Sequence, residues 1–338
     1  MHRERTYTQL CQAGLAIALA GMLAACSNDP APIGDTGSAL SVLSLTRSGE
    51  PMTVGDDYSP VAVFLVENGA QTQSSRFIYK PNETMWRSNL EVVSGHNYTL
   101  YGYAPADAVS AAISGESATG ATMTFSSLPT VSSHDICFVV GVQQLTTTAD
   151  AKAIPLGQLS FTGRPQDQNF ANLLMDHLYA SVRFEMSINS DYAKLRSIRV
   201  KKMELKTSKS TATATVVLAT NTTGTSPVQS VSYSSLAGTE RTTTFFENTE
   251  GQQLDADVLT EAMCCFVPEQ SHQLTLVTTY DVYDRYNNKI SERTATNKLP
   301  NLNAQRGERI TIQLNINPTY LGTLSDPDLD NPALVVGI

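Results

Sequence analysis

Histidines are the first side chains to test for chemistry, because an imidazole can act as a general base or bind a metal. Four of the five lie beyond residue 25, each without a histidine four residues away: His96, His134, His177 and His272. No H-E-x-x-H motif is present that would place two zinc ligands on one helix face. The spacing is typical of structural or surface histidines, and it predicts no metal centre and no catalytic residue.

Other chemical motifs are weak or absent. The chain has no G-x-S-x-G elbow, no Walker loop and no G-x-G-x-x-G. A glycosidase pair of carboxylates stays open, because such pairs meet only in the fold. Asp326, Asp328 and Asp330 have the spacing that opens a calcium loop. Asn331 then stands where that loop needs glycine, and Gly337 where it needs glutamate. An acidic turn before a last strand is favoured, and calcium binding is left open.

Three of the five cysteines lie in the body of the chain: Cys137, Cys264 and Cys265. Cys264 and Cys265 are neighbours in an apolar run, so in a strand their side chains point to opposite faces. One of them could pair with Cys137 in an oxidising compartment. We favour buried thiols that pack as small hydrophobic groups, and the pairing stays open.

The first 25 residues are typical of a secretory signal peptide. Arg3 and Arg5 give a basic start, and the apolar run that follows is too short to span a bilayer. It ends on LAAC, which resembles the bacterial lipobox, with the cut between Ala25 and Cys26. Lipidation of Cys26 would add more than one hydrocarbon chain, which stable anchoring requires. We expect a signal peptide over 1–25 and a tether over 26–39.

Charge and composition exclude some classes of protein. Lys and Arg total 23 against 32 Asp and Glu, for a formal net charge of -9, so the chain lacks the basic surface of a nucleic-acid-binding protein. Charged residues are 16% of the chain. Short apolar runs throughout argue against intrinsic disorder. The length of 338 residues predicts about two domains.

Alternating apolar runs predict a chain built almost wholly of strands. A turn-rich stretch over 163–169 divides the chain into two β-sandwich domains, residues 40–165 and 166–338. The best helical candidate is 170–178, and residues 107–135 are expected to form a longer excursion. Strands are expected at 40–46, 61–66, 76–79, 90–93, 98–103, 136–142, 156–161, 180–188, 198–205, 211–218, 274–283 and 310–316.

Several stretches resemble the fimbrillin family, the pilins of Bacteroidales type V pili. The stretches that carry the resemblance are VAVFLV (61–66), Trp86 with LEV (90–92), YTLYGYAP (98–105), DHLYASVRF (176–184) and the ending NPTYL followed by LSDPDLDNP (317–332). The resemblance implies an all-β fold of two tandem transthyretin-like β-sandwiches, no cofactor, and transport through the periplasm to the outer membrane.

The family resemblance also implies a route of assembly. An arginine-specific protease removes the first strand, and a neighbour's carboxy-terminal segment fills the groove. The matching cleavage site here is Arg47–Ser48, which small residues follow. The donor-strand candidates are Leu334, Val335, Val336 and Ile338. Two alternatives stay open: Arg47 could be a strand-end arginine in water, and the tail could be the last strand of its own domain.

We expect a non-enzymatic fimbrial subunit, made as a lipoprotein and polymerised with other fimbrillin subunits into adhesive filaments. Stalk, tip and anchor roles stay open, as does the host or bacterial surface ligand. The alternative is an outer-membrane lipoprotein that binds glycans, which exposed aromatic platforms would favour. The only tryptophan is Trp86. A glycoside hydrolase is a third hypothesis.

Overall fold

The structure is a computed structural model that describes residues 37–47, 58–145, 147, 157–220, 222, 225–257, 260–269, 273–320 and 327–337. The described residues belong to one compact unit, Gly37–Ile338. The signal peptide, Cys26, most of the tether, Ser48 and Ile338 lie outside them. The predictions made for those residues therefore stay predictions.

Strands make up almost all of the regular structure, which confirms the all-β class. The one helix among the described residues is the single turn α1 (Ser190–Ala193), which begins where the Asn189 side chain accepts hydrogen bonds from the backbone of Asp191 and Tyr192. The best helical candidate, residues 170–178, is not a helix. Those residues form a strand because Ala171, Leu173 and Met175 alternate into the core, and strands hydrogen-bond on both of its sides.

The strands of the described residues form four sheets. The eight-stranded sheet runs in the order β10 (Ser160–Thr162), β5 (Asn97–Ala104), β2 (Val61–Glu67), β3 (Ala70–Lys80), β4 (Met85–Val92), β1 (Ser38–Arg47), β11 (Phe170–His177) and β9 (Cys137–Leu145), and β9 also pairs with β5. A four-stranded sheet has β15 (Val228–Ala237), β14 (Thr211–Ala219), β7 (Gly120–Pro129) and β6 (Ala112–Ser117).

The other two sheets use most of the second half of the chain. One has the order β21 (Pro327–Gly337), β20 (Arg309–Tyr320), β12 (Ala180–Ile188), β17 (Thr260–Phe266) and β8 (Val131–Ser132). The other has the order β16 (Arg241–Gln253), β13 (Arg196–Thr207), β18 (Leu274–Asp284) and β19 (Lys289–Lys298).

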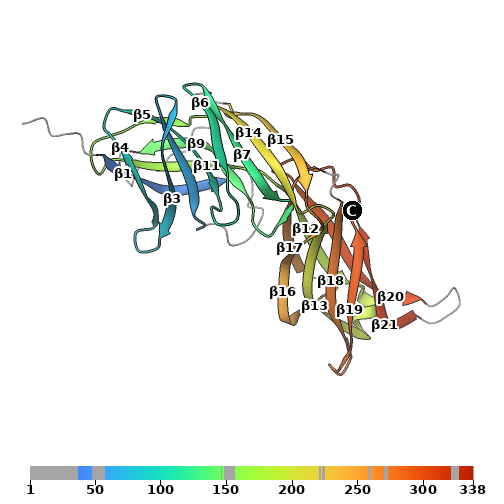
Figure 1. Cartoon of the computed structure of the whole chain (residues 1–338). Coiled ribbons are helices and arrows are strands. Elements are labelled where there is room, and N and C mark those ends of the chain that lie inside the picture. The colour runs from blue at the N-terminus through green and yellow to red at the C-terminus, as the bar shows by residue number, and fades with distance from the viewer. Residues whose placement is uncertain are drawn as a thin grey trace, which may run out of the picture. The chain divides into compact units, whose positions relative to one another are not determined.

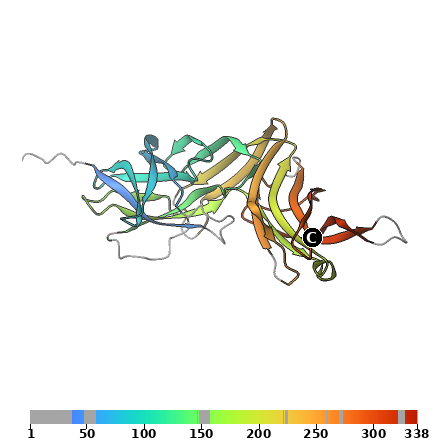
Figure 2. The same cartoon turned by 90° about the horizontal axis from the view of Figure 1, so that it is seen from below.

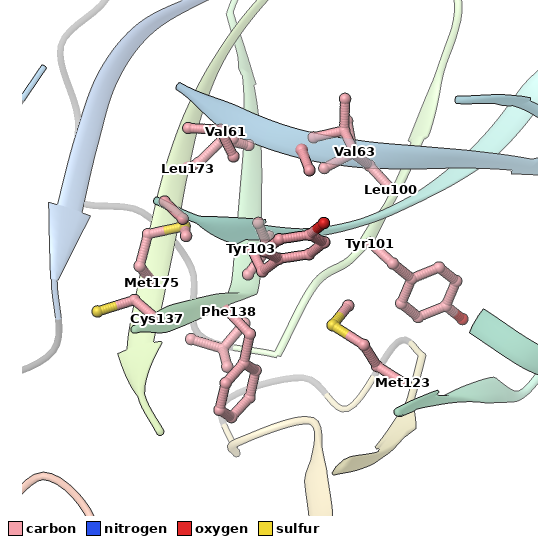
Figure 3. Close-up of a cluster of buried hydrophobic side chains, with 14 of the residues drawn as sticks. Val61, Val63, Leu100, Tyr101, Tyr103, Met123, Cys137, Phe138, Leu173 and Met175 are labelled. Atoms are coloured by element: carbon pink, nitrogen blue, oxygen red, sulfur yellow. The ribbon is translucent and has the colours of Figure 1, made fainter. Parts of the chain in front are cut away.

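The described residues form two hydrophobic cores, and each core takes side chains from more than one sheet. The first core joins the eight-stranded sheet to β7 and β14, and Figure 3 shows part of it, with Val63, Tyr103 and Met123 among the buried side chains. The second core joins the two remaining sheets through residues such as Phe184 and Tyr280. Burial of these apolar groups is the main stabilising contribution to the fold.

Residue 165 does not separate the sheets. β14 pairs antiparallel with β7 from Ala219 opposite Gly120 to Thr211 opposite Pro129. Figure 1 shows β14 and β15, in yellow, beside β6 and β7, in green. β11, which follows residue 165, lies between β1 and β9. The domain division at 165 stays a prediction about folding units, and the cores take strands from both sides of it.

Gly120 tests the pairing of β7 with β14. A Cβ atom at this position would lie 2.1 Å from the carbonyl oxygen of Leu218 on β14, so Gly120→Ala forces the strands apart. Overpacking of this kind costs roughly 1–3 kcal/mol of unfolding free energy, which urea titration measures. Ser127→Ala, exposed on the same strand, is the control and should stay within about 0.5 kcal/mol of the wild type. Equal stability of the two variants would contradict this pairing.

Candidate functional site

The strand expected to be removed, β1, is an interior strand of its sheet. It pairs antiparallel with β4, where Val42 lies opposite Trp86, and parallel with β11, where Leu45 lies opposite Leu173. The pairing with β4 covers residues 38–42 and the pairing with β11 covers residues 41–47, so the two neighbours overlap at Ser41 and Val42. Without β1, the facing edges of β4 and β11 would present unpaired N–H and C=O groups, the kind of edge that recruits another strand.

Side chains of β1 are buried on both faces. Leu40 and Val42 are 0% exposed and belong to the first core. Ser41, 1% exposed, accepts a 2.7 Å hydrogen bond from Nη1 of Arg87 through its hydroxyl. Burying an aliphatic side chain of this size contributes about 1.5–3 kcal/mol. Loss of the strand would thus open an apolar groove and leave Arg87 without this partner.

Arg47, the candidate cleavage residue, ends β1 opposite Met175 of β11. Its side chain is half-buried, so Arg47 is not a fully solvated arginine at the end of a strand. The Arg47 guanidinium also affects the pKa of the Cys137 thiol. Burial raises that pKa well above its ordinary value, Asp135 raises it further, and the positive charge of Arg47 lowers it. A protease would need the end of β1 to open locally before it could bind Arg47.

Three donor-strand candidates, Leu334, Val335 and Val336, lie in β21, the edge strand of its sheet, and Ile338 lies outside the described residues. Leu334 pairs with Ile316 and Val336 with Leu314 of β20, so in this structure the tail is the last strand of its own sheet. Leu334 is buried in the second core, whereas Val335 is 50% exposed. Figures 1 and 2 both show β20 and β21, in red, side by side.

Side chains from the rest of the fold also hold β21. The hydroxyls of Tyr280 and Tyr192 donate hydrogen bonds to the carbonyl oxygens of Pro332 and Leu329, at 2.9 and 2.5 Å. Asp330 forms a 2.8 Å ion pair with Arg196, so this carboxylate of the acidic run already has a cationic partner. The run lies in a strand rather than in the expected turn, with Asp326 outside the described residues.

Tyr280→Phe is expected to loosen β21 without unfolding the protein. The substitution removes the hydrogen bond to Pro332 and costs roughly 0.5–1.5 kcal/mol. Amide exchange should therefore quicken in β21 while β12 and β13 keep their protection, as hydrogen-exchange mass spectrometry would report. Tyr286→Phe is the matched control, because that ring is 70% exposed. Unchanged exchange in β21 would show that Tyr280 does not hold the strand.

A polar pocket of about 670 Å³ is lined by residues of β2, β5, β6, β9, β10 and neighbouring turns. Amide, hydroxyl and guanidinium groups line it, from Asn68, Asn97, Gln143, Gln144, Gln158, Ser117, Ser160, Thr162 and Arg164. Its aromatic residues, Tyr98 and Phe161, are 2% and 7% exposed. Among the described lining residues, none is aspartate or glutamate, so the pocket holds no glycosidase pair from them.

The structure also tests the predictions for the cysteines and for the single tryptophan. Cys137, Cys264 and Cys265 are buried, as favoured above, and Cys137 forms a disulfide with neither of the others. Trp86 is 5% exposed and packs against Tyr79, so the single tryptophan forms no exposed platform. Among the described residues, no helix is long and apolar enough to cross a membrane.

The sequence matches no protein-family model and no curated protein. Solved structures are similar to the chain, among them proteins from Bacteroides fragilis, Bacteroides vulgatus and Porphyromonas gingivalis. A candidate cell adhesion protein from Bacteroides fragilis has 11% identity and a TM-score of 0.44, covering 89% of this chain and 97% of its own. A fimbrial protein from Bacteroides vulgatus has 13% identity and a TM-score of 0.41, covering 88% and 98%. The fimbrial anchor protein Mfa2 from Porphyromonas gingivalis has 11% identity and a TM-score of 0.31, covering 89% and 96%. The chain is thus similar, over most of its length, to fimbrial and cell adhesion proteins of the Bacteroidales.

Proposed function

We propose that the protein is a structural fimbrial subunit, exported as a lipoprotein anchored through Cys26. In this proposal a protease cuts after Arg47, β1 leaves, and the segment 333–338 of another subunit takes its place. The observation that supports the proposal best is the interior position of β1. β1 pairs with β4 over residues 38–42 and with β11 over residues 41–47, and Leu40, Ser41 and Val42 are buried, so an added strand would satisfy the backbone groups and refill the apolar groove together.

The two segments match in sequence. Residues 39–42 read ALSV and residues 333–336 read ALVV. With ALVV aligned on ALSV, Leu334 and Val336 would enter the positions that Leu40 and Val42 fill. Val335 would then stand in the place of Ser41 and could not accept the hydrogen bond from Arg87. Arg87 would keep its ion pair with Glu83, 2.6 Å away.

Exchange also has a favourable count of backbone partners. In its own sheet β21 pairs with β20 alone, whereas β1 pairs with β4 and β11. Aligned on residues 39–44, the donated segment 333–338 would lie beside β4 where residues 39–42 now pair and beside β11 where residues 41–44 now pair, in place of the single neighbour β20. The hydrogen bonds from Tyr192 and Tyr280, worth roughly 1 kcal/mol each, go to Leu329 and Pro332 and are lost only if the rest of β21 detaches as well. The second neighbour supports exchange once β1 has left.

The single tryptophan offers a direct test. Trp86 lies opposite Val42, so its fluorescence should report whether the groove is filled. Protein that begins at Ser27 and is cut after Arg47 should show emission shifted to longer wavelength, as water reaches the ring. A synthetic peptide of residues 327–338 should reverse the shift, and the same peptide with Leu334→Asp and Val336→Asp should not. Equal effects of the two peptides would contradict the proposal.

Lipid attachment needs its own measurement. We propose that Cys26 carries the lipid and holds the precursor at the outer membrane after passage through the periplasm. Cells that produce the chain should incorporate labelled palmitate into it, and Cys26→Ser should abolish the label. Label retained in the Cys26→Ser variant would place the lipid elsewhere or remove the lipoprotein step.

Glycan binding is the second candidate function, and the polar pocket favours it. Amide and hydroxyl groups that line a pocket of this size can exchange hydrogen bonds with sugar hydroxyls. If this is the function, uncleaved protein should bind a glycan, and Arg164→Ala should weaken that binding. Binding by uncleaved protein with no assembly after cleavage would favour this function over the fimbrial one.

A further inference from the structure

A buried cluster of three side chains lies at the junction of β9 and β11. Cys137 and His177 are directly opposite each other in this antiparallel pair, and Asp135 lies two residues before Cys137. The side chains of Asp135 and His177 are 0% and 2% exposed, and Cys137 is 1% exposed. Figure 3 shows the side chains of Cys137 and Phe138 pointing in different directions from β9, and both residues belong to the first core.

The three polar atoms converge on one point. Nδ1 of His177 lies 2.8 Å from Oδ2 of Asp135 and 3.6 Å from Sγ of Cys137, and Oδ2 lies 3.4 Å from Sγ. In a catalytic relay the histidine uses one ring nitrogen for the nucleophile and the other for the carboxylate. Here the thiol and the carboxylate both face Nδ1. The arrangement is therefore a triangle of donor atoms, which is the arrangement of ligands around a metal.

The distances fit a tetrahedral zinc ion. Ordinary zinc bond lengths place a sulfur ligand about 3.5 Å from a nitrogen or oxygen ligand, and those two about 3.3 Å apart. Two sides of the observed triangle already have these lengths. Only the hydrogen-bonded side, between His177 and Asp135, would have to open, by about 0.5 Å.

Charge and supporting contacts also suit a divalent cation. The Asp135 carboxylate and a Cys137 thiolate together supply two negative charges. Nearby, Arg306 donates to Oδ2 of Asp176 at 2.6 Å and to the backbone oxygen of His177 at 3.0 Å, which fixes the end of β11. The backbone N–H of Leu178 donates to the oxygen of Ile136 at 2.7 Å. Supporting contacts of this kind hold metal ligands in place.

We propose that Asp135, Cys137 and His177 bind a divalent transition-metal ion, with zinc as the best fit. On binding, the thiol releases its proton to solvent, a sulfur–metal bond replaces the S–H bond, and Nδ1 of His177 binds the ion as the neutral imidazole. The fourth position is taken by water or by the second oxygen of Asp135. The ion links β9, the segment before it and the end of β11. The proposal does not depend on the fimbrial function.

Metal content is the first test. Protein from Ser27 onward, which keeps the whole unit Gly37–Ile338, is produced with added zinc and dialysed against metal-free buffer. Mass spectrometry should then find about one zinc ion per chain. Cys137→Ser and His177→Ala should each lower zinc affinity by on the order of 100-fold or more, since even loss of a supporting contact costs 10–100-fold.

The matched control is Cys264→Ser. Cys264 is also a buried free thiol, but its sulfur lies beside the backbone oxygen of Ser132 at 3.3 Å and outside the cluster. This variant should keep its zinc. Zinc retained in Cys137→Ser, or lost equally from Cys264→Ser, would overturn the proposal, because the metal would then bind elsewhere or follow the stability of the fold.

Cobalt answers the question without a variant. Wild-type protein folded with Co²⁺ should show the near-ultraviolet absorption of a thiolate–cobalt bond and the visible bands of a tetrahedral ion. That spectrum cannot arise from a variant's failure to fold. A wild-type protein that binds neither zinc nor cobalt, or that binds cobalt without thiolate absorption, would show that the cluster is only a hydrogen-bonded group of buried side chains.

Discussion

Replacing Leu40 with aspartate should unfold the uncleaved protein or bring it close to unfolding. Leu40 is 0% exposed in the first core, so the substitution removes apolar contacts worth roughly 2–5 kcal/mol and buries an unpaired carboxylate at a further cost of several kcal/mol. The sum is comparable to the whole stability of a typical domain, about 5–15 kcal/mol. Urea titration followed by circular dichroism measures the loss.

Thr46→Asp is the matched control for this prediction. Thr46 lies on the same strand and is exposed, so the same new charge stands in water and should change stability by about 0.5 kcal/mol or less. Similar losses in the two variants would mean that β1 is not part of the core. That result would also remove the groove on which the fimbrial proposal depends.

Arg47→Ala should abolish filaments while the fold stays intact. An arginine-specific protease has no side chain to bind at the end of β1 in this variant, so β1 stays in place between β4 and β11. The groove then remains filled and no donor segment can enter it. Electron microscopy of cells that produce the variant should show no filaments from this subunit, and the chain should keep the mass of the uncleaved lipoprotein.

Arg76→Ala controls for the general loss of an arginine. Arg76 lies on β3 with an exposed side chain that forms an ion pair with Asp107. Filaments should form normally in this variant, because cleavage at Arg47 is unaffected. Normal filaments in Arg47→Ala would remove this residue from the mechanism, and loss of filaments in both variants would point to secretion or folding instead.

The local alternation of apolar residues was enough to predict some strands of the second core, but β16 and β19 were not predicted. Residues 274–283 and 310–316 form most of β18 and β20, as expected, because apolar residues alternate with polar ones along both stretches. Residues 107–135 were expected to form an excursion and contain β6 and β7. Small residues fill these strands and β6 is largely exposed, so the hydrophobic signal there is weak.

Non-local pairing could not be predicted in the same way. The segment 170–178 has apolar residues that fit a helix as well as a strand, and the neighbours β1 and β9 decide between them. The Asp135, Cys137 and His177 cluster escaped prediction for a related reason. Its histidine lies forty positions after its cysteine, and only the register of β9 against β11 makes them opposite each other.

Cleavage itself tests the central claim most directly. Purified protein beginning at Ser27 is treated briefly with trypsin, its new amino terminus is sequenced, and the product is run unboiled in detergent. The proposal predicts one dominant cut between Arg47 and Ser48, followed by a ladder of detergent-resistant oligomers that Leu334→Asp with Val336→Asp abolishes. Scattered cuts, or a monomer that is cut after Arg47 and never forms a ladder, would contradict polymerisation by strand replacement.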